Sequence, residues 1–424
     1  MAMKFEKLSS KFIKPLVPTP PSLKHYKISF IDELIPFMNV SIVLFFTKNS
    51  NRNVVHLQKS LEKTLVRLYP LAGRYVEASH TIDCNDQGVE FTQSTVNIKL
   101  EDVVSPKVNV KSIDEFIPFI TTTQTVVLKI QLTTFKCGGV ALGVSATHKA
   151  VDASTLSTFL YEWVATSREV NEIKFTTPGF NSSSLFSARG VHSISLPLVS
   201  GDDMVSKYTR KKVSFSESVI SKLKAKAMVM SGRRLSKVQL ALSVIWKALI
   251  GVDRAKHDCQ RESILYQMLN LRERMASPIH KFSCGNLVSM CPIKLVETSV
   301  DDGGLANVLS DYIKKVMNEY SKVHHDSEEG QMMVLNSFLN IANINPETTD
   351  VIISTSWCKF PFYELDFGFG KPIWVVPGTM PIKKLVHLID DAQGNGLEAY
   401  IFLELKDVPC FEAALDINVF GSVL

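Results

Sequence analysis

The stretch "VALGVSATHKAVDASTLSTFLYEW" (residues 140–163) joins an apolar run to a helix-like run through one histidine and one aspartate. Side chains alternate along an extended chain, so the even positions from Val140 to His148 share one face. This apolar face predicts a strand that ends at His148. A side chain at a strand end projects at an edge of the sheet, where ligand clefts commonly form.

A helix is predicted directly after this strand. Apolar residues from Leu156 to Val164 recur at helical spacing, and either Asp152 or Ser154 can cap the helix. Asp152 therefore lies in the tight connection between the strand and the helix.

His148 can act as a base, because an imidazole has an unperturbed pKa of about 6.5 and is largely neutral near pH 7. A buried structural histidine at a strand end gives the same pattern, and from the spacing alone that alternative stays open. Asp152 can orient the ring, or it can hold the turn by accepting backbone N–H groups. A histidine followed four residues later by an aspartate is a weak pattern by itself.

Signatures of other chemistries are missing from the sequence. It contains no GxSxG elbow, no P-loop and no GxGxxG motif. The seven cysteines form no CxxC pair, the ten histidines form no HExxH motif, and the adjacent His324 and His325 are expected in an exposed loop. We therefore expect no metal site, no tightly bound cofactor and reduced thiols in a cytoplasmic protein.

Composition excludes several classes of protein. Of 424 residues, 45% are hydrophobic and 21% are charged, which is typical of a folded globular chain. A net charge of +5 over this length is too small to indicate a nucleic-acid partner. The first residues contain no apolar core of a secretory signal, and no apolar run of about 18 residues predicts a membrane span.

Helices and strands intermix along the whole chain, which predicts an α/β fold. Amphipathic helices are predicted at 55–69 and 235–255, with Ser236 as the N-cap of the second. Further strands are predicted at 125–135, 287–296, 351–357 and 397–405.

The domain organisation is predicted to be two-lobed. Residues 1–175 are expected to form an N-terminal lobe whose first 25 residues are an extended, proline-rich arm. Periodicity fades over 176–210, a polar segment that we interpret as the inter-domain linker. Residues 211–424 are expected to form the C-terminal lobe.

Several ordered blocks resemble the BAHD acyltransferases of plants, whose signatures are HxxxD near the middle and DFGWG near the C-terminus. The blocks are "YPLAGR" (69–74), "FKCGGVALGVSATHKAVD" (135–152), "NLRERM" (270–275), "CGN" (284–286), "SWCKFPFYELDFGFGKP" (356–372) and "GNGLEAYIFL" (394–403). They span nearly the whole chain and keep the family's order. The opening "VPTPPSLKHYKISFIDEL" (17–34) resembles the branch with vinorine synthase-like and acylsugar acyltransferases.

The resemblance implies a fold and a reaction. The fold would be that of chloramphenicol acetyltransferase, with mixed sheets flanked by helices and a channel between two lobes. We allow for part of 356–385 packing on the N-terminal lobe. The implied reaction transfers an acyl group from acyl-CoA to a small-molecule alcohol in a ternary complex, without an acyl-enzyme.

The resemblance also implies roles for particular residues. His148 would be the general base, and Asp152 would hold the turn. Asp366 would be structural near the CoA side and would pair with an arginine, for which Arg272 is the best match and Arg274 the alternative. Two glycines of the second motif would share that structural role, and one serine is a weak candidate for a CoA contact. These residues are Gly368, Gly370 and Ser236.

Two departures from the family pattern concern Ala153, where glycine is common, and Phe369, where tryptophan is usual. Neither touches His148, so activity is expected. The donor is expected to be acetyl-CoA or another short-chain acyl-CoA. The acceptor is expected to be an acylsugar, alkaloid or terpenoid alcohol, and the enzyme a monomer.

Two alternatives remain at this point. One is a non-catalytic binding protein of the same fold. The other is a peptide-condensation enzyme, which shares a similar HHxxxDG pattern, but Thr147 precedes His148 here and no carrier-protein module is attached.

Overall fold

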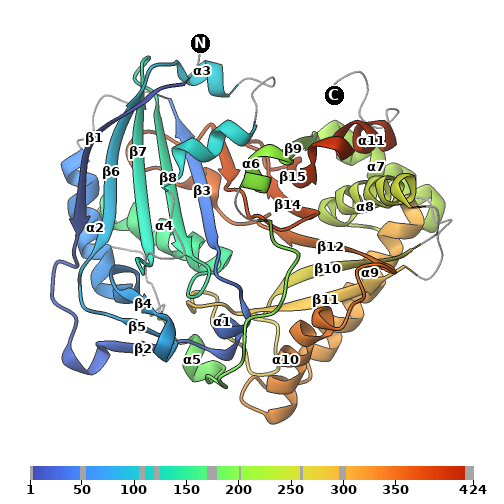
Figure 1. The fold of residues 1–424 in the computed structure, drawn as a ribbon, viewed down its shortest axis with the longest axis horizontal. Helices are drawn as coiled ribbons and strands as arrows, with labels where there is room; N and C mark the ends of the chain where they lie inside the picture. Colours follow the sequence, from blue (N-terminus) through green and yellow to red (C-terminus); the bar gives the residue numbers. More distant parts are fainter. Residues whose placement is uncertain are drawn as a thin grey trace. The chain divides into compact units, whose positions relative to one another are not determined.

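Two structural units share the chain (Figure 1). The computed structural model describes residues 3–47, 54–104, 110–118, 125–169, 179–199, 202–257, 261–295 and 302–415. The first unit comprises Met1–Ser193, Ile279–Leu287 and Phe360–Thr379. The second comprises Ile194–Pro278, Val288–Lys359 and Met380–Leu424. The channel that the resemblance implies between two lobes stays a prediction.

The first unit is built on a six-stranded sheet in the order β1-β6-β7-β8-β3-β13. Its strands are β1 (Phe5–Ile13), β3 (Asn39–Phe46), β6 (Val89–Val96), β7 (Leu128–Phe135), β8 (Val140–Thr147) and β13 (Trp374–Pro377). Only the β6–β7 pair of this sheet is parallel. A small sheet adds β2 (His25–Lys27), β4 (Arg74–Val76) and β5 (Thr81–Asp83).

Helices of the first unit flank this sheet. They are α1 (Phe30–Leu34), α2 (Val54–Arg67), α3 (Leu100–Val103), α4 (Ala153–Ser167) and α5 (Ser182–Leu185). The two longest pack together, and the indole N–H of Trp163 on α4 donates to the Leu57 carbonyl of α2 at 3.1 Å. Trp163 is fully buried, so this bond fixes α4 while satisfying a buried donor.

The second unit is built on another six-stranded sheet, in the order β11-β10-β12-β14-β15-β9. Its strands are β9 (Tyr208–Phe215), β10 (Glu262–Asn270), β11 (Val288–Lys294), β12 (Thr349–Ser356), β14 (Leu385–Asp390) and β15 (Leu397–Glu404). Its helices are α6 (Asp202–Ser206), α7 (Glu217–Ser231), α8 (Lys237–Lys256), α9 (Asp302–Tyr320), α10 (Glu328–Ala342) and α11 (Val408–Ala414).

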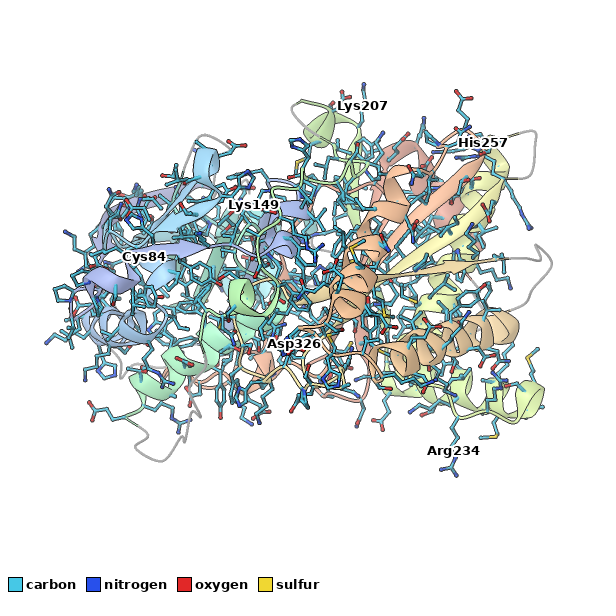
Figure 2. All side chains as sticks on the ribbon, turned by 90° about the horizontal axis from the view of Figure 1, so that it is seen from below. Cys84, Lys149, Lys207, Arg234, His257 and Asp326 are labelled. Carbon is cyan, nitrogen blue, oxygen red and sulfur yellow. The ribbon has the colours of Figure 1, made fainter. Side chains whose placement is uncertain are left out.

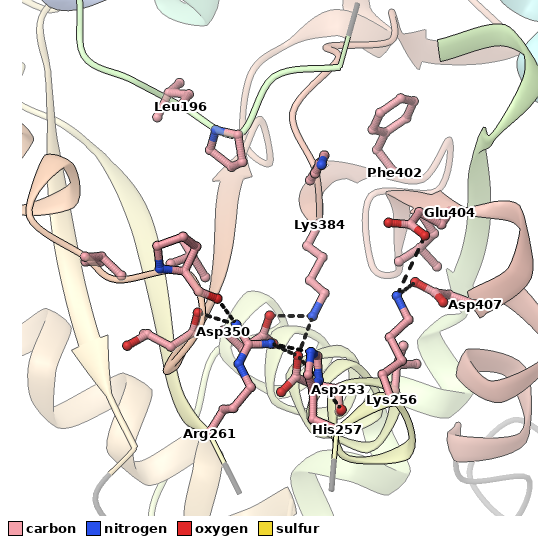
Figure 3. Close-up of a pocket in the computed structure, with 18 of the residues that line it drawn as sticks. Leu196, Asp253, Lys256, His257, Arg261, Asp350, Lys384, Phe402, Glu404 and Asp407 are labelled. Carbon is pink, nitrogen blue, oxygen red and sulfur yellow. Dashed lines mark hydrogen bonds and ion pairs between the residues drawn. The ribbon is translucent and has the colours of Figure 1, made fainter. Parts of the chain in front are cut away.

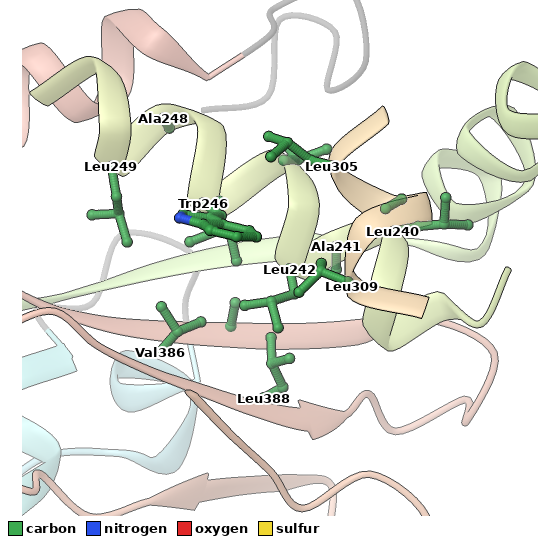
Figure 4. Packing of buried hydrophobic residues seen from close by; sticks show 14 of the residues in the cluster. Leu240, Ala241, Leu242, Trp246, Ala248, Leu249, Leu305, Leu309, Val386 and Leu388 are labelled. Carbon is green, nitrogen blue, oxygen red and sulfur yellow. The ribbon is translucent and has the colours of Figure 1, made fainter. Parts of the chain in front are cut away.

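The core of the second unit lies between α8 and its sheet. Figure 4 shows Trp246 and Leu249 of α8 facing Val386 and Leu388 of β14. The Trp246 indole N–H donates to the Ser263 hydroxyl at 2.9 Å. β10, β12 and β14 run parallel, and their neighbours run antiparallel. Mixed sheets flanked by helices are thus present in both units, as predicted.

Most predicted elements correspond to α2, α8, β7, β11, β12 and β15, with ends that differ by a few residues. The extended N-terminal arm is only partly right, because Phe5–Ile13 forms β1 and pairs with β6 along its length. The exposed side chains of Leu8 and Phe12 lie on this edge strand. Its sequence FEKLSSKFI is mostly polar and charged and its side chains are mostly exposed, which suits an edge strand.

The boundary between the units falls between Ser193 and Ile194, inside the segment predicted as a linker. That segment is not all linker, since it contains α5 and the first residues of β9. β9 is built by pairing with β15, a partner far away in sequence, so local periodicity could not reveal it. Among the described residues, no helix combines the length and apolar character needed to cross a bilayer.

Candidate active site

His148 follows the last residue of β8, and its backbone is held on both sides. Its N–H donates to the Met38 carbonyl at 2.8 Å, and its carbonyl accepts from Nδ2 of Asn286 at 2.6 Å. The side chain is partly exposed, whereas the ring Nδ1 is buried and has no hydrogen-bond partner among the described residues. The strand end therefore presents an imidazole on an anchored backbone.

Burial outweighs the neighbouring charges in its effect on the pKa of this ring. Burial lowers the pKa of His148 below its ordinary value, because the charged imidazolium loses hydration. The Asp152 carboxylate and the Asn286 amide act in the opposite direction, and Lys149 adds to the lowering. Because the net shift is downward, the ring can accept a proton at neutral pH.

Asp152 caps the helix that follows. Its Oδ1 accepts from the Thr155 backbone N–H at 2.7 Å and from the Thr155 hydroxyl at 2.8 Å, as an N-cap residue of α4 does. Its Oδ2 accepts from the backbone N–H of Leu287 at 3.2 Å. Asp152 thus fixes the turn after His148 and a distant segment at once.

That distant segment, residues 284–287, is called the strap here. Thr155 holds it by accepting from the Gly285 N–H at 3.1 Å. Gly285 has φ +111°, and an added Cβ would lie 2.0 Å from Oγ of Ser182. Only glycine suits this position, and it lets Asn286 reach the His148 carbonyl.

Two residues of the site were not predicted, Asn286 and the buried Asp32. Oδ1 of Asp32 accepts from Nδ2 of Asn286 at 2.6 Å and from its backbone N–H at 2.9 Å. Both lie in blocks that carry the family resemblance, "CGN" and "KISFIDEL". Nothing in the local pattern of either block indicates that the two side chains meet.

Lys149, the residue after His148, anchors another part of the first unit. Its side chain is buried (labelled in Figure 2), and Nζ donates to the Glu33 carbonyl at 3.1 Å and to the Ser193 hydroxyl at 2.9 Å. The Glu33 carboxylate accepts the backbone N–H groups of Arg189, Gly190 and Val191. Burial lowers the pKa of Lys149. Segment 189–193 is thereby tied to the turn that carries His148.

The DFGFG motif forms a tight loop on the first unit. Oδ1 of Asp366 accepts from the N–H groups of Gly368 at 2.7 Å and Gly370 at 3.0 Å. Both glycines have positive φ, +95° and +81°, which favours glycine there. The buried ring of Phe367 lies edge-on to Trp163 of α4, with ring centroids 4.8 Å apart.

Within its own unit, Asp366 contacts a cation that the sequence did not predict. Oδ2 of Asp366 lies 3.7 Å from the guanidinium of Arg168, the C-cap residue of α4. Arg272, the predicted partner, belongs to the second unit, where its guanidinium donates to Oδ1 of Asn270. The alternative, Arg274, belongs to the same unit. The DFGFG loop packs against the end of α4, which brings Asp366 to Arg168. The predicted pair of Asp366 with Arg272 or Arg274 stays a prediction.

Ser236 occupies the N-cap of α8 and forms a capping box with Gln239. This agrees with the sequence interpretation. The contact with CoA that was assigned to Ser236 stays a prediction.

A cavity of about 1070 Å³ is lined by residues of the second unit alone. Figure 3 shows that its charged residues pair with one another. Lys384 contacts both Asp253 and Asp350, Arg261 contacts Asp253, and Lys256 contacts Asp407. In these pairs each charged side chain is already matched by one of opposite sign. They therefore indicate no particular class of ligand for the cavity.

Among the described residues, no three His, Cys, Asp or Glu side chains are grouped as metal ligands would be.

Comparison with protein families places the chain among acyltransferases. The model of the Transferase family matches residues 3–416. Vinorine synthase from Rauvolfia serpentina is 32% identical over 416 residues, which cover 95% of this chain and 94% of that protein. A limonoid 21-O-acetyltransferase from Melia azedarach is 32% identical, covering 98% of this chain and 97% of that protein. A pelargonidin glucoside malonyltransferase from Salvia splendens is 30% identical, covering 99% of this chain and all of that protein.

Solved structures share the fold. The crystal structure of vinorine synthase superposes with a TM-score of 0.84 at 30% identity, covering 99% of this chain and 98% of that chain. TRI101 of F. sporotrichioides, solved with coenzyme A and T-2, gives a TM-score of 0.71 at 19% identity, covering 93% and 98% of the two chains. The match to a family model over almost the whole length, with relatives of this identity, shows that the chain belongs to the BAHD acyltransferases of the Transferase family.

Proposed function

We propose that this acyltransferase moves an acyl group directly from acyl-CoA to the hydroxyl of a specialised metabolite, with His148 as the general base. The observation that carries the proposal is the His148 ring itself. It is partly exposed, held on an anchored strand end, and kept neutral by burial.

The proposed step balances without any other protein group. His148 takes the proton of the acceptor hydroxyl while the oxygen attacks the thioester carbonyl. The tetrahedral intermediate then collapses, the carbon–sulfur bond breaks, and the imidazolium returns the proton to the CoA thiolate. General-base catalysis of this kind typically contributes about 10²–10⁴-fold, and holding both substrates together contributes further.

Four of the cysteines are poorly suited to carry an acyl group. The thiols of Cys84, Cys284 and Cys291 are buried. Burial raises the pKa of Cys84, Cys291 and Cys358 to about 12. Because the thiolate is the nucleophile, these groups are poor candidates for a covalent intermediate. Direct transfer in a ternary complex is the simpler mechanism.

The names of the relatives suggest which donors and acceptors this enzyme uses. Their names specify acetyl and malonyl donors, and acceptors that include a limonoid and a pelargonidin glucoside. We infer an acetyl or other short-chain acyl-CoA as donor. We infer an alkaloid, terpenoid or acylsugar alcohol as acceptor. The cytoplasmic location and monomeric state stay predictions from the sequence.

A substrate panel tests this function. Purified enzyme is incubated with acetyl-, malonyl- and isobutyryl-CoA against alkaloid, terpenoid and sugar alcohols, and release of free CoA thiol is followed. We expect acceptor-dependent thiol release, with double-reciprocal plots that intersect. Parallel plots would indicate an acyl-enzyme. No release across the panel would favour a non-catalytic binding protein.

A further inference from the structure

A buried polar cluster lies directly behind the strap. It comprises Tyr26 of β2, Ser29 and Asp32 at α1, Ser182 of α5 and Asn286. Asp32, Ser29, Ser182 and Asn286 are fully buried or nearly so, and all five residues belong to the first unit. Burying a carboxylate is costly unless its oxygens receive hydrogen bonds. A cluster with this cost is expected to have a role other than stabilising α1.

The hydrogen bonds converge on the Asp32 carboxylate. Oδ2 accepts from the Ser29 N–H at 2.8 Å, from the Ser29 hydroxyl at 2.6 Å and from the Ser182 hydroxyl at 3.1 Å. Oδ1 accepts both N–H groups of Asn286 described above. Burial raises the pKa of the Asp32 carboxyl, and the hydrogen bonds from Ser29 and Asn286 act against that shift. In the ionised form the carboxylate only accepts, which suits an arrangement in which each neighbouring group donates.

The direction of one hydrogen bond adds Tyr26 to the cluster. Its hydroxyl lies 2.8 Å from Oγ of Ser182. The single proton of the Ser182 hydroxyl is already donated to Asp32, so Tyr26 must donate to Ser182. Burial raises the pKa of Tyr26, which keeps its hydroxyl protonated as this role requires.

The cluster fixes the orientation of the Asn286 side-chain amide. Nδ2 of Asn286 donates both to Asp32 and to the His148 carbonyl, each at 2.6 Å. With both its protons so placed, the amide cannot rotate without losing a bond to the carboxylate. Its Oδ1 is buried and has no hydrogen-bond partner among the described residues. Asn286 is therefore clamped from behind by Asp32 and holds the backbone of His148 in front.

We propose that Asp32 is a positioning residue for the reaction, acting through Asn286 on His148, with Ser29, Ser182 and Tyr26 as its support. This inference rests on the proposed role of His148 as base. Asp32 touches neither the ring nor a substrate in this account. It fixes the geometry from which the ring meets the acceptor hydroxyl, and a misplacement of about 1 Å can cost about 10²-fold in rate.

The central test is a double-mutant cycle in kcat. Asp32→Asn replaces an accepting oxygen by a donor that faces donors. We expect kcat to fall about 10–100-fold, while KM for acyl-CoA changes less than about threefold. Asn286→Ala is expected to give a similar loss. If Asp32 acts through Asn286, the double variant is no slower than Asn286→Ala alone. Losses that multiply would overturn the proposal.

A matched control separates positioning from stability. Asp86 is a partly buried carboxylate of the same unit that accepts from Thr19 and Lys24 and lies outside the cluster. Asp86→Asn is expected to lower Tm without lowering kcat. An equal loss of kcat in Asp86→Asn would reduce the role of Asp32 to general stability.

A milder variant keeps the test decisive if Asp32→Asn does not fold. Ser182→Ala removes one of the donors to Asp32 and is expected to lower kcat severalfold at unchanged KM. Wild-type kcat in a folded Ser182→Ala would contradict the proposal.

A readout that needs no turnover separates this proposal from the proposed function. The side-chain amide protons of Asn286, assigned by their loss in Asn286→Ala, are expected to exchange slowly in the wild type and rapidly in Ser182→Ala. Unchanged exchange would overturn the clamp. Full activity in His148→Ala would instead overturn the function and leave this result intact.

Discussion

His148 and Asp152 lie four residues apart but serve different neighbours. The His148 ring is partly exposed, whereas Asp152 is buried and accepts from Thr155 and Leu287. Asp152 still favours the charged form of the imidazole through its field. The geometry therefore supports one base and one residue that holds the turn and the strap.

The lowered pKa of His148 predicts the pH dependence of the reaction. The base must be neutral, so kcat/KM should fall only as the pH drops through a value below about 6.5. A pH–rate profile with a single acceptor measures this, with circular dichroism showing that the fold persists at the acid end. An acid limb centred above pH 7 would contradict the account.

Substitutions at Asp152 separate its structural role from a catalytic one. Asp152→Ala removes the cap of α4, which costs about 0.5–2 kcal/mol. It also leaves the Leu287 N–H unpaired, which adds about 1–3 kcal/mol. Tm and kcat should therefore fall together. Asp152→Asn keeps one accepting oxygen, so its Tm and kcat should lie between those of the wild type and of Asp152→Ala. An unchanged Tm with abolished turnover in Asp152→Ala would indicate a direct catalytic role.

The residues of the site differ in how far the sequence could predict them. The positions of His148 and Asp152 at a strand end and a helix start follow from local patterns, whereas their roles were implied by the family resemblance. Asp32 and Asn286 meet across 254 positions of sequence, and hydrogen-bond partners at such separation leave no local pattern. The contact of Asp366 with Arg168 was missed for the same reason, since Arg168 ends a helix in another block.

The two family motifs meet on one element, helix α4. Asp152 caps its first turn, and the DFGFG loop packs against its last turns through Phe367 and Arg168. The second motif therefore supports the first by bracing the helix that follows His148. Its glycines allow the tight path of the loop, and Phe367 packs on Trp163. The structural role near the CoA side that the sequence suggested for the motif stays a prediction.

This bracing predicts unequal effects of the two members of the ion pair. The Arg168 side chain is half exposed and 3.7 Å from Asp366, so Arg168→Ala should cost less than about 1 kcal/mol. Asp366→Ala also loses the bonds to Gly368 and Gly370, and should cost about 1–3 kcal/mol. Chemical denaturation of both variants measures the difference. Equal costs, or a loss of turnover at normal stability in Asp366→Ala, would contradict this role.

α4 also carries a buried carboxyl that makes stability depend on pH. Burial raises the pKa of Glu162 to about 7, with only partial compensation from Arg67. A raised folded-state pKa gives stability that is full below about pH 4.5 and is lost as the pH rises through about 7. The shift corresponds to roughly 3 kcal/mol.

Glu162→Gln tests this directly. The variant should melt at a higher temperature than the wild type at pH 8, and the gap should shrink at pH 5. The exposed Glu101→Gln on α3 serves as the control and should change Tm little at either pH. A Tm difference at pH 8 no larger than that of the control would show that ionisation of Glu162 does not destabilise the folded protein.

Helices and strands with one apolar face were predicted well. Strands that form mainly by pairing with a distant strand were predicted poorly. α2 and α8 carry clear helical stripes, and their bounds agree closely with the predicted ones. β1 is largely exposed and β9 is rich in polar and charged residues, and both strands pair with partners far away in sequence, β6 and β15. Such strands can be recognised only once the whole sheet is known.

For the molecule as a whole, the fold class came from two independent sources. Intermixed helix and strand patterns predicted two α/β lobes, and the ordered motif blocks predicted the acyltransferase fold. The interleaving of Ile279–Leu287 and Phe360–Thr379 into the first unit was beyond local patterns. That interleaving is what delivers both Asn286 and the DFGFG loop to the unit that holds His148.

The central claim is that His148 is the base of a direct acyl transfer. The most direct measurement compares kcat/KM of His148→Ala and wild type with acetyl-CoA and one acceptor from the panel. The exposed His25→Ala serves as the matched control, and circular dichroism checks the fold of each variant. We predict a loss of about 10²–10⁴-fold for His148→Ala with an unchanged spectrum, and none for His25→Ala. A folded His148→Ala that turns over at the wild-type rate would contradict the account.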